Sequence, residues 1–276
     1  PRGWGWPAFR SRRSWAGSAA PGLTAAQLAE TGTPEAIAPM ARRLIRLLAH
    51  GLPRADGREA RRAEPARGVA EVLWTRLTRL PRTPARVAVL DAALVLLADH
   101  ELASSTLAVR LAAMVRADLH EAVGAGLNVI GGVRHGGASL QIEALLRDAA
   151  RVGPAASLAG RIDDRGRLAG FGHPLYDDGD PRAAALLARL ADLDAPGDRH
   201  ATVEAVLAAV AERGAAAPNV DVALAALSFC ADMPPGSGEA IFALARTAGW
   251  IAHAIEQYGQ PTFMRARVDY VGPTPR

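Results

Sequence analysis

Three histidines, an aspartate and an arginine lie in short motifs whose side chains could activate a carbon acid. His100 stands between two acidic residues, His135 precedes a pair of glycines, and His173 follows a Gly-x-Gly turn. Arg182 and Asp221 come farther on, in Asp-Pro-Arg and Pro-Asn-Val-Asp. Imidazoles, a carboxylate base and arginines together suit the removal of a proton from carbon beside a bound polycarboxylate.

Each of these side chains also has an ordinary structural explanation. A histidine near a helix end, such as His100, is usually structural, and Asp221 could cap the helix that follows it. Two further arginines, Arg246 and Arg265, could be a surface charge and a tail charge. Structural charges outnumber catalytic ones in proteins. The functional interpretation therefore depends on the motifs occurring together and in one order.

Six segments in unbroken order resemble the citrate synthase family. They are ADHELASSTLAVR at 98–110, GVRHGGAS at 132–139, GFGHPLYDDGDPR at 170–182, PNVD at 218–221, FALARTAGWIAH at 242–253 and RARVDYVG at 265–272. Five places depart from the family's pattern: Val133-Arg134, Pro174, Ala103, Ala169 and Ala266. None of these departures removes a side chain that the resemblance makes catalytic. The part before residue 90 is shorter than in the family and carries no motif.

The resemblance implies a role for each catalytic side chain. Asp221 matches the general base that takes a methyl proton from acetyl-CoA. His135 matches the residue that stabilises the resulting enol, and His173 matches the acid that polarises and protonates the ketone of oxaloacetate. A thioester α-proton is a poor acid, so the base needs such an enol-stabilising donor in a site shielded from water.

The resemblance also implies binding residues. His100, Arg182 and Arg246 match the groups that bind the oxaloacetate carboxylates, where the planar fork of arginine suits a carboxylate better than lysine does. Arg265 matches an arginine that reaches into the partner subunit's site. The expected contacts with coenzyme A are Arg167, Leu168, Ala169, Gly170 and Gly172. Arg165 is a further candidate for a phosphate contact, although both it and Arg167 could simply pair with Asp163 and Asp164.

The implied reaction is the condensation of acetyl-CoA with oxaloacetate, followed by thioester hydrolysis to citrate and CoA. No metal and no permanently bound cofactor is implied; acetyl-CoA is a cosubstrate. One alternative is 2-methylcitrate synthesis from propionyl-CoA, because one methylene changes the binding free energy by only ~1–3 kcal/mol. Another is a degenerate relative that binds CoA or a carboxylate and regulates a partner. A nucleic-acid-binding protein would rest on arginine content alone.

The periodicity of apolar residues predicts an all-α fold, since no convincing alternating strand pattern is present. The expected helices are 69–80, 84–99, 103–121, 122–130, 140–152, 183–193, 202–213, 220–231 and 239–258, with one more after Pro34. Residues 153–180 are predicted to be a loop, and Asp180 and Ser237 to be helix N-caps. Small residues along 122–130 suit close packing, including packing at a two-fold interface.

A citrate-synthase-like, two-domain helical homodimer is the architecture that the resemblance implies. The large domain would take 22–136 and 239–276, the small domain 137–238, and residues 1–21 would form a disordered tail. The bulk composition agrees with a packed protein, because 50% of the 276 residues are hydrophobic. The 32 basic residues are all arginine, and the net charge is +4. A single cysteine, Cys230, excludes an internal disulfide and fits a reducing cytoplasm.

Overall fold

The computed structural model describes residues 34–55, 67–132, 138–162, 167–260, 269, 271 and 272. Within these residues the chain is helical and contains no strand, only an isolated bridge between Phe171 and Pro218. The all-α prediction is therefore confirmed. The helices are α4 (Pro34–Gly51), α5 (Val69–Leu77), α6 (Pro84–Leu96), α7 (Ser104–Met114), α8 (Leu119–Ile130), α9 (Ala138–Val152), α10 (Pro154–Leu158), α11 (Pro181–Arg189), the 3₁₀ turn η1 (Leu190–Asp192), α12 (Arg199–Ala211), α13 (Val220–Cys230) and α14 (Ser237–Tyr258).

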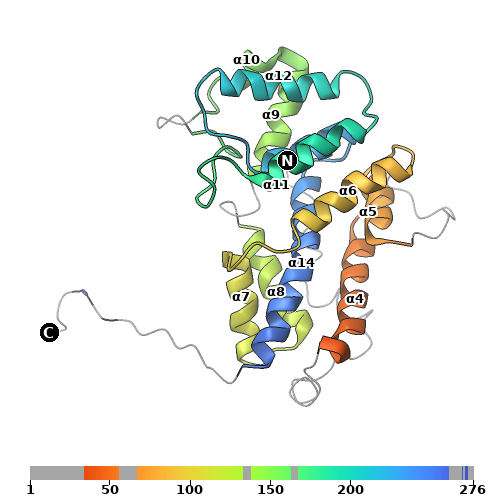
Figure 1. The fold of residues 1–276 in the computed structure, drawn as a ribbon, viewed down its shortest axis with the longest axis vertical. Helices are drawn as coiled ribbons and strands as arrows, with labels where there is room; N and C mark the ends of the chain where they lie inside the picture. Colours follow the sequence, from red (N-terminus) through yellow and green to blue (C-terminus); the bar gives the residue numbers. More distant parts are fainter. Residues whose placement is uncertain are drawn as a thin grey trace.

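The helices gather in two groups (Figure 1). Helices α9, α10, α11 and α12 lie toward one end of the molecule, and α4, α7 and α8 lie toward the other. Helix α14 runs from the middle of the molecule through the group of α4, α7 and α8, and it contacts α4, α6, α7, α8, α9 and α13. Among the described residues, none of the helices combines the length and the hydropathy required to cross a lipid bilayer.

Local sequence signals explain where several helices begin. Asp180 caps α11 by accepting a hydrogen bond from the backbone N–H of Arg182 at 3.0 Å, and Pro181 occupies the first turn. Asp118 caps α8 in the same way, accepting from Glu121 N at 2.8 Å. In both places the short acidic side chain satisfies an amide that the helix itself leaves unpaired.

The predicted helix 103–121 is wrong, because the chain breaks between α7 and α8. Arg116 has a φ of 62°, and its side chain donates to the carbonyl of Tyr258. The Tyr258 hydroxyl returns a hydrogen bond to Ala117 O at 2.7 Å. These contacts with the end of α14 compensate the interrupted helix, and the Asp118 cap then starts α8.

Two further local predictions are also wrong. Helix α10 lies within 153–180, a segment that the sequence predicts to be loop throughout. Ser237 is the first residue of α14, and the N-cap is Gly236, whose φ of 87° is accessible to glycine at little cost. The Ser237 hydroxyl instead donates to Pro234 O at 2.7 Å.

Close packing of α8 occurs within the chain. A Cβ on Gly126 would lie 2.8 Å from Val109 Cγ2 and 2.9 Å from the Trp250 ring, so this glycine lets α7 and α14 approach α8. Gly126 thus serves a contact within the chain. Cys230 is buried in α13, as expected for a small core residue.

Candidate active site

A short backbone pairing joins the loop that precedes His173 to the segment that precedes Asp221. Gly172 N donates to Ala217 O at 2.8 Å, and the Asn219 side-chain Nδ2 donates to Gly172 O at 3.0 Å. The bridge between Phe171 and Pro218 lies between these bonds. Two motifs that are far apart in the sequence are therefore held side by side.

Glycine is required at Gly170 for two reasons. Its φ is +82°, in the region that side chains disfavour, and a Cβ would lie 2.8 Å from Ile142 Cγ1 and 2.9 Å from Val222 Cγ2. Its carbonyl accepts a hydrogen bond from Asn219 N at 2.9 Å. The loop therefore packs closely against α9 and α13 at Gly170, and the hydrogen bond from Asn219 N holds it there.

Asp221 lies in the first turn of α13 but does not cap it. The cap is Asn219, whose side chain accepts a hydrogen bond from Asp221 N at 3.0 Å. Burial raises the pKa of the Asp221 carboxyl to about 7, with a smaller raising effect of Asp180 and an opposing effect of Arg182. A carboxylate whose pKa lies near neutral pH is suited to act as a general base.

His173 is held as a neutral imidazole of one tautomer. Its Nδ1 accepts a hydrogen bond from Leu175 N at 3.1 Å, so the proton of the neutral ring is on Nε2. Burial lowers the pKa of His173, and the charge of Arg182 lowers it further. The ring can therefore donate a proton or a hydrogen bond through Nε2.

His100 lies edge-on to His173, with ring centroids 5.3 Å apart and an interplanar angle of 84°. Its Nε2 is 2.9 Å from the hydroxyl of Tyr176. Burial lowers the pKa of His100, and Arg182 and Arg246 lower it further. Two histidines from separate segments of the chain thus meet beside two arginines.

Helix α14 positions the segment that ends at His100. Arg246 Nε donates to Leu97 O at 2.8 Å, and Gly249 N donates to Ala98 O at 3.0 Å. His253 Nε2 lies 3.2 Å from Asp99 Oδ1. The three α14 residues recur at helical spacing on one face, so a single helix face binds three consecutive residues before His100.

Arg182 is paired with Asp180 through a fork. Its Nε donates to Asp180 Oδ1 at 2.9 Å, and its Nη2 donates to Oδ2 at 2.8 Å. Oδ2 also accepts from Val220 N at 3.0 Å, which ties α11 to the start of α13. Burial opposes ionisation of Asp180, but the hydrogen bonds and charge of Arg182 outweigh it and lower the pKa of this carboxyl. Three of the five guanidinium protons remain for a ligand.

Arg246 is almost fully buried, with 1% of its surface exposed. Its Cζ lies 4.9 Å from the ring centroid of Phe242, and its Nη2 has no hydrogen-bond partner among the described residues. Burial lowers the pKa of Arg246 to about 10, and Arg182 contributes to that shift. A buried cationic donor without an acceptor is costly, and a ligand carboxylate would satisfy it.

The residues predicted to contact coenzyme A differ in their exposure and backbone contacts. Leu168 is buried with 5% of its surface exposed, whereas Arg167 is exposed. Gly170 and Gly172 use backbone groups to hold the loop against 217–219. Ala169, which precedes Gly170, is half-buried. These contacts remain predictions, and His135, Arg165 and Arg265 lie outside the described residues.

Sequence reasoning missed three residues that organise this site. Tyr176 stands in the family-like motif without a predicted role, and Asp180 is predicted only as a helix cap. Asn219 provides both the cap of α13 and the bond to Gly172 O. A polar residue directly before a helix was the available signal for Asn219, whereas nothing local pointed to the partners of Tyr176.

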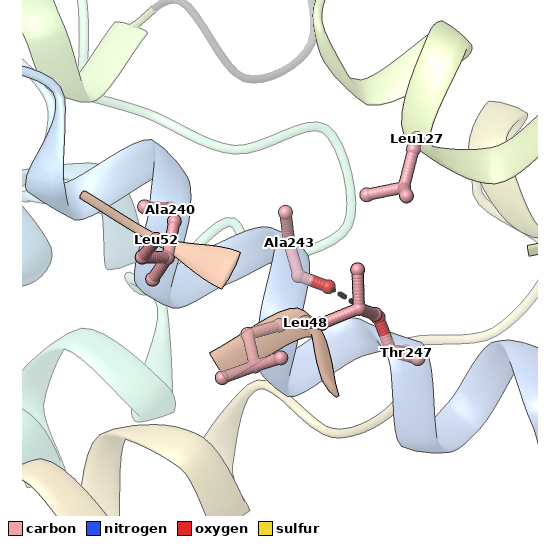
Figure 2. Close-up of a pocket in the computed structure, with 7 residues that line it drawn as sticks. Leu48, Leu52, Leu127, Ala240, Ala243 and Thr247 are labelled. Carbon is pink, nitrogen blue, oxygen red and sulfur yellow. Dashed lines mark hydrogen bonds between the residues drawn. The ribbon is translucent and has the colours of Figure 1, made fainter. Parts of the chain in front are cut away.

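An apolar pocket lies elsewhere, among helices α4, α8 and α14 (Figure 2). It is lined by Leu48, Leu52, Leu127, Ala240, Ala243, Leu244 and Thr247. The one polar side chain in this lining, Thr247, donates its hydroxyl to Ala243 O at 2.8 Å. None of the described site residues lines this pocket.

Known proteins with similar sequences belong to the family that the motifs resemble. The family described as citrate synthase, C-terminal domain, matches residues 11–267. Citrate synthase 2 of Bacillus subtilis is 31% identical over 256 residues, which cover 89% of this chain and 68% of that protein. The 2-methylcitrate synthase of Shewanella oneidensis is 32% identical over 192 residues, which cover 68% of this chain and 51% of that protein.

A solved structure gives the same result for the fold. Citrate synthase of Thermoplasma acidophilum, in a ternary complex with carboxymethyl coenzyme A and oxaloacetate, superposes with a TM-score of 0.70 at 25% identity. The match covers 95% of this chain and 70% of that one. The chain spans about half to two thirds of the length of the curated relatives it matches. Since the family match includes nearly the whole chain, this protein belongs to the citrate synthase family.

Proposed function

We propose that this protein condenses acetyl-CoA with oxaloacetate and hydrolyses the thioester, giving citrate and CoA. One observation carries the proposal. A carboxyl group with a pKa of about 7, Asp221, shares a site with two neutral imidazoles and two buried arginines. This combination supplies a base for a carbon acid and cations for a dicarboxylate.

The proposed steps move one proton to Asp221 and one proton from His173. The Asp221 carboxylate takes a proton from the acetyl methyl group, and the methyl carbon then bonds to the ketone carbon of oxaloacetate. His173 donates the Nε2 proton to the ketone oxygen, which becomes the hydroxyl of the product. Water then cleaves the thioester: its hydroxyl bonds to the acyl carbon, and a proton goes to the sulfur, which leaves as the free thiol of CoA. Solvent returns the Nε2 proton to His173 and takes the proton from Asp221. His135 stabilises the enol in this scheme.

His100, Arg182 and Arg246 bind the oxaloacetate carboxylates in the proposal. The spare Nη2 of Arg246 and the unused protons of Arg182 support this role. Arg167, Leu168, Ala169, Gly170 and Gly172 make the coenzyme A contacts. CoA enters as acetyl-CoA, a cosubstrate, and no cofactor is permanently bound.

The whole-molecule proposal is a homodimer of two-domain subunits. The large domain takes 22–136 and 239–276, the small domain 137–238, and the site lies between them. An apolar stripe along α7 and its C-cap residue supports a subunit interface, because Leu107, Leu111 and the C-cap Val115 are 41%, 43% and 60% exposed at helical spacing. Arg265 then completes the partner's site. We place the protein in the cytoplasm, which its single buried cysteine supports.

The test is free-thiol release from acetyl-CoA and from propionyl-CoA, each with and without oxaloacetate. Release that needs oxaloacetate, together with citrate as the identified product, is the expected result. Faster release from propionyl-CoA would assign the chain to 2-methylcitrate synthesis. No release from either thioester, with CoA still bound in calorimetry, would favour a regulatory relative that has lost catalysis.

A further inference from the structure

Tyr176 contacts three residues of the proposed oxaloacetate site at once. Its hydroxyl lies 2.9 Å from His100 Nε2, and its ring centroid lies 4.8 Å from that of His173. The Cζ of Arg182 lies 5.7 Å from the centroid of the Tyr176 ring.

Packing alone does not account for this tyrosine. Its side chain is half-buried and lies outside the hydrophobic core. The backbone around it forms turns, in which Tyr176 N donates to His173 O at 3.3 Å and Gly179 N donates to Tyr176 O at 3.4 Å. These bonds fix the position of the loop, and the hydroxyl then reaches across to a different segment of the chain.

The Tyr176 hydroxyl is the hydrogen-bond partner of His100 Nε2. A tyrosine hydroxyl that donates to Nε2 leaves the proton of the neutral imidazole on Nδ1. The hydrogen bond made by one ring nitrogen sets the protonation of the other. Nδ1–H is then available to a carboxylate oxygen, whereas an unprotonated nitrogen would repel one.

We propose that Tyr176 is a positioning residue of the substrate site, whose hydroxyl fixes the tautomer and orientation of His100. Its ring also contacts both His173 and Arg182. The identity of the substrate as oxaloacetate rests on the proposed function. The contact between Tyr176 and His100 does not.

The test compares Tyr176→Phe with Tyr258→Phe. Both variants keep the ring and lose one hydroxyl hydrogen bond, and the Tyr258 hydroxyl bonds to Ala117 O at 2.7 Å away from the site. Tyr176→Phe should raise the KM for oxaloacetate about 3- to 10-fold, the range expected for one neutral hydrogen bond, and leave the KM for acyl-CoA nearly unchanged. Tyr258→Phe should leave both constants unchanged.

The second readout is the ¹⁵N spectrum of the His100 ring. Wild type should show a protonated Nδ1 and a hydrogen-bonded, unprotonated Nε2, and Tyr176→Phe should change this tautomer. Unchanged His100 signals, or an equal rise of both KM values, would overturn the proposal. If the wild-type protein shows no turnover, only the proposed function is contradicted. The ¹⁵N comparison then still decides whether Tyr176 positions His100.

Discussion

At the scale of single residues, the site holds more buried positive charge than negative charge. Arg182 and Arg246 are both buried, Asp180 neutralises one of them, and the pKa of Asp221 near 7 leaves that carboxyl partly protonated at neutral pH. A carboxylate of a bound ligand would balance this excess. The folded chain therefore carries an electrostatic cost that substrate binding removes.

Replacing Asp221 with asparagine should abolish most turnover and stabilise the fold. Loss of a positioned base lowers turnover by ~10²–10⁴-fold. Because the pKa of Asp221 is higher in the folded chain than its ordinary value of 3.8, wild type loses stability as the pH rises from 3.8 through about 7. An asparagine side chain cannot ionise, so Asp221→Asn should melt at a higher temperature than wild type at pH 8, with a smaller difference at pH 5.5.

Thermal melts of the two proteins at both pH values check this prediction. Asp178→Asn, at an exposed position of the nearby loop, is the matched control and should leave the melting temperature and the turnover unchanged. A lower melting temperature for Asp221→Asn at pH 8, or turnover close to wild type, would contradict the assignment of Asp221 as a buried base.

The Arg182→Lys variant should weaken oxaloacetate binding more than acyl-CoA binding. Lysine keeps the charge but cannot make the fork with Asp180 while also offering a second fork to a carboxylate. A hydrogen bond to a charged group contributes ~1.5–3 kcal/mol, so the Kd for oxaloacetate should rise about 10- to 100-fold. Isothermal calorimetry with each ligand provides the measurement.

Arg189→Lys is the control for that experiment. Arg189 lies on the same helix, its side chain is 52% exposed, and its pairing distance with Asp192 is 3.9 Å. An exposed pair of this kind contributes ~0–1 kcal/mol, so both ligands should bind as they do to wild type. If Arg182→Lys weakened both ligands equally, loss of the Asp180 link between α11 and α13 would explain the effect instead.

At the scale of elements, α14 acts as the support for the His100 segment. Gly249 is the residue at which the helix and this segment come closest, because a Cβ there would overlap Ala98 O and lie 2.9 Å from Asp99 Oδ1. Residues on either side of Gly249 along the same face bind Leu97 and Asp99. A substitution that displaces this helix face from residues 97–99 should therefore also displace His100.

Gly249→Ala should destabilise the protein and weaken oxaloacetate binding, although alanine is the better helix former. Its methyl group must displace a backbone oxygen, with an overpacking cost of ~1–3 kcal/mol. Gly124→Ala in α8 is the matched control, since a Cβ there meets no described atom within 4 Å. That variant should gain about 0.5–1 kcal/mol. Urea unfolding of both variants measures the change in the free energy of unfolding. Equal changes for Gly249→Ala and Gly124→Ala would contradict a special role of the Gly249 contact.

At the scale of the whole molecule, the exposed apolar stripe on α7 predicts the oligomeric state. Leu111→Glu places a charge in the middle of the stripe and should shift the protein from dimer to monomer in light scattering after gel filtration. Val152→Glu alters an apolar residue that is 56% exposed at the end of α9, and it should leave the mass unchanged. A monomeric wild type would contradict the proposed dimer.

The role of Arg265 can be tested within the same dimer. Arg265→Ala and Asp221→Asn should each be nearly inactive, whereas coexpressed chains should regain part of the activity. In a mixed dimer both lesions would fall in one site and leave the other site whole. No gain over either parent would mean that Arg265 serves its own subunit.

The sequence by itself determined the helical class, several helix starts and the family. Capping at Asp180 is local, because its side chain bonds the amide of Arg182 two residues away. The motifs around His100, His173 and Asp221 were likewise readable in order along the chain. These features depend on neighbours within a few residues, and such neighbours are visible in a linear sequence.

Only the tertiary structure decided which of these residues meet and how they ionise. The break before α8 depends on Arg116 reaching Tyr258, 142 positions away, and periodicity alone predicted one helix there. Tyr176 meets His100 across 76 positions. The pKa of Asp221 near 7 arises from burial, which is a property of the packed chain. Contacts and desolvation of this kind come from segments distant in sequence, so no local pattern could specify them.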